Sequence, residues 1–81
     1  MWYLYIVHCS DNSLYTGVTT DVSRRVKEHN LTTGGIYTRT RTPVELVYQE
    51  PHTNRSSALK RELQIKKWPR TKKLALINGQ S

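Results

Sequence analysis

The chain has 81 residues, enough for one hydrophobic core and too few for two, so we expect a single domain over residues 1–81. With 13 Lys and Arg against 6 Asp and Glu, the net charge is +7, which favours a polyanionic partner. The single cysteine excludes an internal disulfide, and no apolar run approaches the ~20 residues that span a bilayer.

The amino-terminal residues predict a β-hairpin. Residues 2–8 are aromatic and β-branched, residues 10–13 are a turn-forming cluster, and residues 14–18 resume an apolar run. Alternate residues of a strand share a face, so Leu4 and Tyr5 point to opposite sides of the sheet. The segment lacks the cationic start and small-residue cleavage site of a signal peptide, so we expect a cytoplasmic protein that does not bind membranes.

The next segment predicts a helix over residues 22–30. Asp21 and the threonines before it offer N-cap oxygens, and the segment contains no Pro or Gly. Val22 and Val26 lie one turn apart and define a buried stripe. Residues 31–43, with two adjacent glycines and repeated Thr-Arg pairs, have no periodicity and predict a basic loop.

Residues 44–48 predict a third strand that Pro51 closes. A second helix begins within residues 54–57 and runs to about Trp68, where Pro69 either ends helical structure or starts a third short helix. These elements predict the order ββαβαα and the α+β class. We expect a sandwich in which helices flank a small, mainly antiparallel three-stranded sheet.

Glu62 breaks the apolar pattern of the second helix. At about 100° per residue, Glu62 points into the middle of a buried arc formed by Ala58, Leu59, Leu63 and Ile65. It could lie at the edge of a thin core and pair with a Lys or Arg. Alternatively, the carboxylate is held for a cation, since an isolated buried charge is costly. One carboxylate suffices for a magnesium ion that keeps most of its waters.

The first helix carries two further candidates. Arg25 and His29 lie beside the apolar stripe, one turn apart. The residues predicted to face away are Arg24, Lys27 and Glu28. The pair could be a surface arginine beside a half-buried histidine. Together with the glutamate of the second helix, they would instead form an Arg, His and carboxylate cluster typical of phosphodiester chemistry.

Tyr5 and Tyr15 lie on the two arms of the hairpin, and their spacing allows both hydroxyls onto one face. Strand tyrosines are most often core residues, which is the alternative interpretation. Gly17, two residues after Tyr15, would leave that face open to a substrate. No pair of His or Cys residues has a zinc-chelating spacing.

Order, spacing and residue type together resemble the GIY-YIG nuclease superfamily. The motifs are Tyr3-Leu4-Tyr5, then Tyr15-Thr16-Gly17, then Arg25, His29 and Glu62. The similarity covers nearly the whole chain and is closest to the small stand-alone bacterial branch, related to the catalytic domain of the excision-repair nuclease. The sequence departs from the family in lacking the Gly-Ile-Tyr form of the first motif. It also has a valine at residue 18, where excision-repair relatives often carry a lysine.

The resemblance implies a role for each of these residues. Tyr5 and Tyr15 would activate water, Arg25 would bind the scissile phosphate, and His29 would orient groups or transfer protons. Glu62 would hold one Mg²⁺ or Mn²⁺ ion, with no small-molecule cofactor. Since a free tyrosine with a pKa of about 10 is a poor base at pH 7, we expect the arginine, the basic surroundings and the metal to lower the pKa of Tyr15, the tyrosine that would accept the proton of the attacking water.

The implied function is a metal-dependent endonuclease acting on DNA, on branched or damaged structures in repair or recombination. Predicted phosphate contacts are Arg39, Arg41, Lys60, Arg61, Lys66, Lys67, Arg70, Lys72 and Lys73. An ordinary solvated helix face is the alternative for the C-terminal part of this set. We expect a monomer, with specificity from DNA shape or from a partner protein. Alternatives are a non-catalytic module that binds nucleic acid or protein, and an RNA-binding accessory, which would not need Glu62 on an apolar face.

Overall fold

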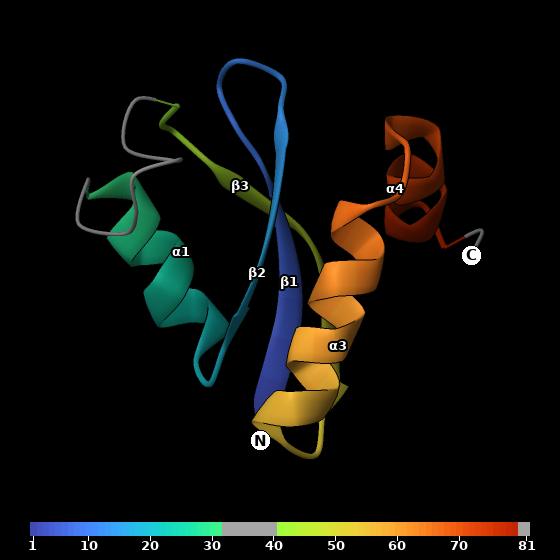
Figure 1. Cartoon of the computed structure of the whole chain (residues 1–81). Coiled ribbons are helices and arrows are strands. Elements are labelled where there is room, and N and C mark those ends of the chain that lie inside the picture. The colour runs from blue at the N-terminus through green and yellow to red at the C-terminus, as the bar shows by residue number, and fades with distance from the viewer. Residues whose placement is uncertain (32–40, 80–81) are drawn as a thin grey trace.

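Residues 1–31 and 41–79 are described by this computed structural model. The elements in chain order are β1 (Trp2–His8), β2 (Leu14–Thr19), α1 (Val22–Asn30), β3 (Glu45–His52), α3 (Arg55–Lys66) and α4 (Arg70–Ile77). The strands form one antiparallel sheet in the order β2-β1-β3, with α1 on one face and α3 and α4 on the other (Figure 1). The predicted order ββαβαα and the α+β class are confirmed.

β1 and β2 form the predicted hairpin. Tyr5 pairs with Gly17, and Val7 pairs with Tyr15. In the turn, Asn12 has a φ of 71°, a left-handed conformation that asparagine tolerates better than most residues. Because β1 is the central strand, its middle residues 4–7 are each no more than 1% exposed.

β3 is longer than predicted. It continues past Pro51, so the expectation that this proline closes a strand ending at Tyr48 was wrong. β3 lies at the edge of the sheet, where a backbone nitrogen that faces solvent needs no partner strand, so a proline, which lacks an N–H, is tolerated. A bulge interrupts the pairing, since Ile6 pairs with Tyr48 whereas Val7 pairs with Leu46.

α1 and α3 each begin directly after a capping residue that the sequence predicted. α1 has the predicted bounds, and Asp21 Oδ1 accepts a hydrogen bond of 3.0 Å from the N–H three residues on. Asn54 Oδ1 caps α3 in the same way, accepting a bond of 2.8 Å from Ser57 N. α4 starts directly after Pro69, so this proline precedes a third helix, the second of the two predicted alternatives.

A small core lies on each face of the sheet. On the α1 face the buried residues are Tyr5, Val7, Cys9, Val22 and Val44. On the face covered by α3 and α4 they are Leu4, Ile6, Ile65 and Leu76. Successive residues of β1 therefore serve different cores, as the strand alternation predicts. Among residues 1–31 and 41–79, no helix is both long and apolar enough to span a bilayer.

The buried stripe of α3 is narrower than predicted. Ala58 and Ile65 are fully buried, but Leu63 is 59% exposed, so its assignment to the buried arc was wrong. Leu63 lies roughly 140° around the helix axis from Ala58, beyond the strip that contacts the sheet. Glu62 lies one turn from both buried residues, and its side chain is only 15% exposed.

Candidate active site

The centre of the candidate site is a buried pair of side chains. Tyr5 Oη and His29 Nε2 lie 3.0 Å apart and are hydrogen-bonded, and both residues are 1% exposed. Tyr5 reaches this position because strand alternation directs it toward α1. His29 reaches it because it lies two turns from Val22 on the inner stripe of that helix. Each polar group satisfies the other in a place that water does not reach.

Tyr15 completes an aromatic cluster around this pair. Its ring centroid lies 6.4 Å from that of Tyr5 and 5.5 Å from that of His29, with an edge-on angle of 68° to the imidazole. The predicted placement of both tyrosines on one face is confirmed. Tyr15 is half-buried, so it lies nearer the surface than its two neighbours.

Gly17 has a different structural role from the one predicted. A Cβ atom at this position would lie 2.6 Å from Tyr5 Oη and 2.8 Å from Tyr5 Cζ. The space expected to be open to a substrate is therefore filled by the phenol ring of Tyr5. Glycine is needed here because the ring of the neighbouring strand crosses directly over its backbone.

Arg25 reaches the cluster from α1. It is half-buried while Arg24 is exposed, which confirms that Arg25 is the inward residue. Its Nη1 donates to Glu28 Oε1 at 3.3 Å. Glu28 was expected to face away, and that expectation was wrong, because it is half-buried and pairs with the inward arginine. A glutamate three residues after an inward arginine is the sequence signal that was missed.

Burial controls the protonation of the central pair. It raises the pKa of Tyr5 to about 12, even though a hydrogen bond with Arg25 acts in the opposite direction. Burial, assisted by the charge of Arg25, lowers the pKa of His29 below its ordinary value. A phenol and a neutral imidazole therefore face each other at neutral pH. The lowered pKa was expected for Tyr15, the predicted base; for Tyr5, loss of hydration outweighs the arginine.

Glu62 reaches the cluster from α3, on the other side of the sheet edge. Its charge contributes to raising the pKa of Tyr5, after burial and the charge of Tyr15, so its carboxylate acts on the same phenol as Arg25. Glu62 Oε2 pairs with Lys66 Nζ at 3.6 Å, and that Nζ lies 5.9 Å from the ring centroid of Tyr15. The five predicted residues, Tyr5, Tyr15, Arg25, His29 and Glu62, are thus brought together.

The surroundings of Glu62 would suit a metal ion held by one protein carboxylate. Among residues 1–31 and 41–79, no group of three or more His, Cys, Asp or Glu side chains could hold a metal. The carboxylate of Glu62 is sheltered, and the ion pair it makes is long for a charge-assisted contact. Magnesium, which keeps most of its waters and accepts one protein carboxylate, suits such a position.

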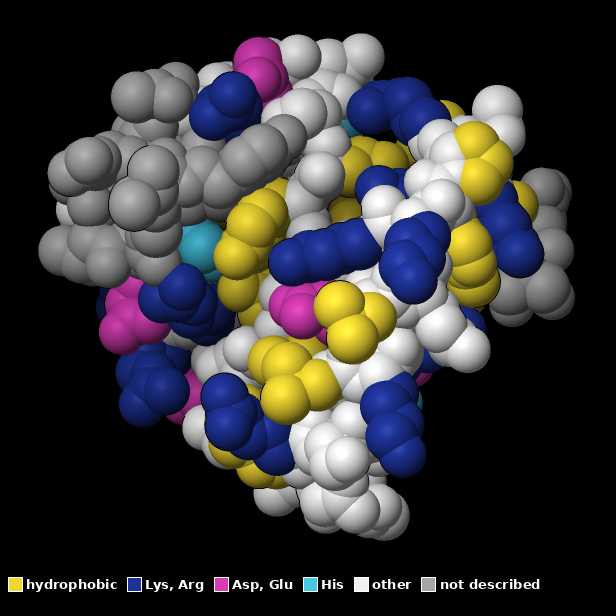
Figure 2. All heavy atoms as spheres, viewed as in Figure 1, with side chains coloured by type: hydrophobic (Ala, Val, Ile, Leu, Met, Phe, Trp, Pro, Cys, Tyr) yellow, Lys and Arg dark blue, Asp and Glu magenta, His cyan; other side chains and the backbone are white. Residues whose placement is uncertain are grey.

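The predicted phosphate contacts differ in their exposure and in whether they form ion pairs. Lys60, Lys67, Arg70 and Lys72 are exposed, Lys73 is half-buried, and Lys66 is paired with Glu62. Figure 2 shows Lys and Arg side chains spread over the face that α1 and α3 border. Arg41 and Arg61 are instead engaged in ion pairs, with Asp11 at 2.9 Å and with Glu50 at 3.1 Å. Arg39 lies outside the described residues.

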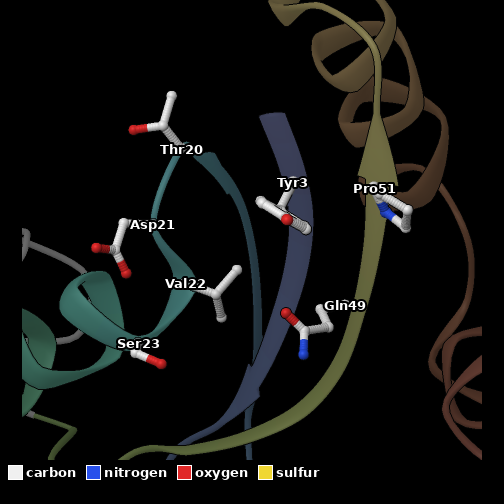
Figure 3. Close-up of a pocket in the computed structure, with 7 residues that line it drawn as sticks. All are labelled: Tyr3, Thr20, Asp21, Val22, Ser23, Gln49 and Pro51. Atoms are coloured by element: carbon white, nitrogen blue, oxygen red, sulfur yellow. The ribbon is translucent and has the colours of Figure 1, made fainter. Parts of the chain in front are cut away.

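A shallow hollow at the start of α1 is separate from the cluster. Figure 3 shows its lining, which is formed by Tyr3, Thr20, Asp21, Val22, Ser23, Gln49 and Pro51. None of the five clustered residues contributes to this lining. The hollow is therefore not part of the candidate site.

The sequence model of the GIY-YIG catalytic domain matches residues 1–75. The chain therefore belongs to the GIY-YIG catalytic domain family, a nuclease-type family. Within it, the chain is similar to a UPF0213 protein of Haloquadratum walsbyi, with 61% identity over 74 residues, 91% of this chain and 83% of that one. It is 56% identical over 75 residues to a UPF0213 protein of Staphylococcus aureus, which covers 93% and 92% of the two chains.

Two solved structures have the same fold. A solution structure of a UPF0213 protein from Bacillus halodurans superposes with a TM-score of 0.62 at 42% identity, covering 96% of this chain and 84% of that one. A solution structure of a protein from E. faecalis gives 0.63 at 39% identity, covering 95% and 82%. The resemblance to small stand-alone members of the family is confirmed.

Proposed function

We propose that the protein is an endonuclease that hydrolyses phosphodiester bonds of DNA with one divalent metal ion, acting on branched or damaged DNA in repair or recombination. The observation that carries the proposal is the buried bond of 3.0 Å between Tyr5 and His29, with Tyr15 against both rings. Arg25 adds a cation from α1, and Glu62 adds an anion from α3. A proton acceptor, a phosphate ligand and a metal ligand are the groups that phosphodiester hydrolysis requires.

Proton transfer would be divided between the two tyrosines. Tyr15 is half-buried and can reach a water molecule, so it would take the proton of the attacking water while its own phenolic proton passes to the imidazole of His29. Tyr5 keeps its own proton at neutral pH, because burial raises its pKa to about 12. Its role is to fix the imidazole of His29, which contacts both tyrosine rings and moves the proton onward.

Charge on the phosphate would be stabilised from two sides. The guanidinium of Arg25 donates to the non-bridging oxygens, a geometry that a planar fork of donors suits. Glu62 would hold the metal, which supplies Lewis-acid stabilisation of the leaving oxygen when bound. The two residues come from helices on opposite faces of the sheet, so the substrate would lie across the β2 edge.

Binding would rest on phosphate contacts rather than on base reading. The net charge of +7 and the exposed side chains of Lys60, Lys67, Arg70 and Lys72 support contacts to the nucleic-acid backbone. Such contacts do not select a sequence. Specificity would therefore come from the shape of branched or damaged DNA, or from a partner protein, with the nuclease acting as a monomer.

The test is a cleavage assay with purified protein on plasmid, branched DNA and structured RNA, each with Mg²⁺, Mn²⁺ or EDTA. We expect metal-dependent cleavage of DNA that Glu62→Ala and Arg25→Ala each reduce at least 100-fold, a typical effect of removing one electrostatic group from a reacting centre. Glu45→Ala, at an exposed glutamate on β3, is the matched control and should cleave like wild type. Activity that survives both site substitutions refutes the mechanism. DNA binding without cleavage on any substrate would instead establish a non-catalytic binding module.

A further inference from the structure

Lys66 lies close to both Glu62 and Tyr15 in the candidate site. It follows Glu62 by one helical turn, and its Nζ lies 3.6 Å from Glu62 Oε2. The same Nζ lies 5.9 Å from the centroid of the Tyr15 ring. The lysine side chain is 48% exposed whereas the glutamate side chain is 15% exposed. A partly exposed ammonium is therefore placed over a sheltered carboxylate, beside the half-buried tyrosine.

We propose that Lys66 is the internal counter-ion of Glu62, which a divalent cation must displace, and that the released ammonium then binds a phosphate of the nucleic acid. The inference rests on the proposed function, because it takes Glu62 as the metal ligand. In this proposal Lys66 has two partners in succession, first Glu62 and then a phosphate. A lysine that only contacts DNA at the surface would have the phosphate alone.

The first step follows from the surroundings of the carboxylate. A largely buried anion requires a nearby positive charge, and Lys66 supplies it when no metal is bound. A metal ion at Glu62 would replace that charge and repel an ammonium only a few ångströms away. The lysine can leave at small cost, since its side chain is long and nearly half exposed.

The second step follows from where the lysine would go. A phosphate bound near Tyr15 and the metal ligand lies within reach of the same flexible stem, and an ammonium is a good point-charge ligand for phosphate. Arg25 is arranged in a similar way on α1, where it pairs with Glu28 of the same helix at 3.3 Å. Each charged end of the candidate site is thus neutralised by a neighbour on its own helix.

The competing explanation is an ordinary helix-surface pair. Pairs of Glu and Lys four residues apart stabilise helices without any further role. Lys67 provides the comparison, because it is the next residue, has the same charge and is exposed. A general effect of removing one positive charge would be the same at both positions, whereas a counter-ion effect would be confined to Lys66.

The first experiment measures Mn²⁺ affinity without nucleic acid, by electron paramagnetic resonance of free Mn²⁺. We expect Lys66→Met to bind Mn²⁺ about two- to fivefold more tightly than wild type, the range that a partly exposed ion pair supports. Lys67→Met should change the affinity by less than a factor of about two, since its charge is more distant and screened. Glu62→Gln should lose binding. Equal effects of the two lysine substitutions, or no Mn²⁺ binding by wild type and Lys66→Met, would overturn the proposal.

The second experiment measures binding of a cleavage-resistant phosphorothioate duplex by fluorescence anisotropy, in Mn²⁺ and in EDTA. Lys66→Met should weaken binding in Mn²⁺ and have little effect in EDTA, where the ammonium remains on Glu62. Lys67→Met should have the same effect in both conditions, because its charge is not paired with the metal ligand. An effect of Lys66→Met that does not depend on the metal contradicts the exchange of partners.

These measurements do not depend on cleavage. If the Lys66 effects are observed but no substrate is cut, the nuclease function fails while the counter-ion role stands. If DNA is cut with Glu62 required but Lys66→Met leaves Mn²⁺ affinity unchanged, the counter-ion role alone fails.

Discussion

The two faces of the sheet differ in what they contribute to the protein, although β1 supplies both. Toward α3 and α4, β1 presents Leu4 and Ile6, which pack against Ile65 and Leu76 in an apolar core. Toward α1, it presents Tyr5, which makes a buried polar bond with a histidine. A central strand of alternating residues can therefore contribute to an apolar core with one set of side chains and to a polar, aromatic cluster with the other.

The polar groups on the two faces also differ. On the α3 face, Glu50 accepts hydrogen bonds from Tyr48 and Arg61 and is bonded to His52, an arrangement that ties β3 to α3. Burial alone would raise the pKa of Glu50, but these neighbours keep it below its ordinary value. The polar groups of this network are hydrogen-bonded to one another. Around Tyr5, by contrast, the charged residues lie at the two ends of the cluster, where a substrate could replace their present partners.

The largest expected effect on stability is at the apolar core. Ile6→Ala should lower the free energy of unfolding by about 2–5 kcal/mol, because Ile6 is fully buried and a cavity would remain. Urea denaturation measures this. Ile6→Val is the matched control, with an expected loss of about 0.5–1.5 kcal/mol. A loss below about 1 kcal/mol for the alanine variant would show that this face does not hold the fold together.

The next largest effect on stability is expected where Gly17 of β2 contacts Tyr5 of β1. Gly17→Ala should cost about 1–3 kcal/mol, because the new methyl group would lie 2.6 Å from Tyr5 Oη and 2.8 Å from Tyr5 Cζ. It should also change the imidazole signals of His29 in the NMR spectrum. Gly79→Ala is the control, since its φ of +78° makes alanine unfavourable there but no atom lies within 4 Å. If both variants leave the His29 signals unchanged, the close approach over Gly17 is wrong.

A smaller effect should appear on acidification. The pKa of His29 is lowered by burial and by Arg25, so below the ordinary histidine pKa of about 6.5 the unfolded chain binds more protons than the folded one. Stability is therefore fully present above about pH 6.5 and is lost as the pH falls toward the folded pKa. His29→Gln should remove this loss between about pH 6.5 and 5, whereas His8→Gln should retain it. An unchanged pH profile in His29→Gln contradicts the buried, neutral state of this imidazole.

The smallest single effect on stability is expected at Lys60, and its neighbour Arg61 on α3 provides the contrast. Lys60→Ala, at an exposed residue, should leave stability within about 0.5 kcal/mol of wild type and reduce the salt dependence of DNA binding by about one phosphate contact. Arg61→Ala should instead cost about 1–3 kcal/mol, because it leaves the sheltered Glu50 without its arginine. Urea denaturation and binding at several salt concentrations distinguish the two. The reverse pattern would mean that Arg61 belongs to the DNA-binding surface.

Local rules predicted the residues that belong to regular elements. The spacing of the hairpin placed Tyr5 and Tyr15 on one face, and helical periodicity identified Arg25 as the inward arginine. The same periodicity put Glu62 on the inner side of α3, where it lies between Ala58 and Ile65. These predictions succeeded because strand alternation and helix period depend only on neighbouring residues.

The features that the sequence did not predict depend on contacts between segments that are far apart in the chain. Whether Pro51 ends a strand depends on whether β3 lies at the sheet edge, which sequence patterns did not reveal. The burial of the Tyr5 ring over Gly17 requires the register of the hairpin, and this burial raises the pKa of Tyr5. Arg61 looked like a solvated cation because its partner, Glu50, lies on another element.

The central claim is that the tyrosine and histidine of the proposed reaction lie on the α1 face, with Glu62 reaching them from α3, and two tyrosines test it most directly. Tyr15 and Tyr48 are both half-buried strand residues, one on each face. The measurement is the rate of metal-dependent DNA cleavage per folded molecule for Tyr15→Phe and Tyr48→Phe. We expect Tyr15→Phe to lose at least 100-fold with its fold intact, as removal of a general base requires. Tyr48→Phe should cleave like wild type while losing about 1 kcal/mol of stability with its bond to Glu50. Equal rates for the two variants would contradict the account.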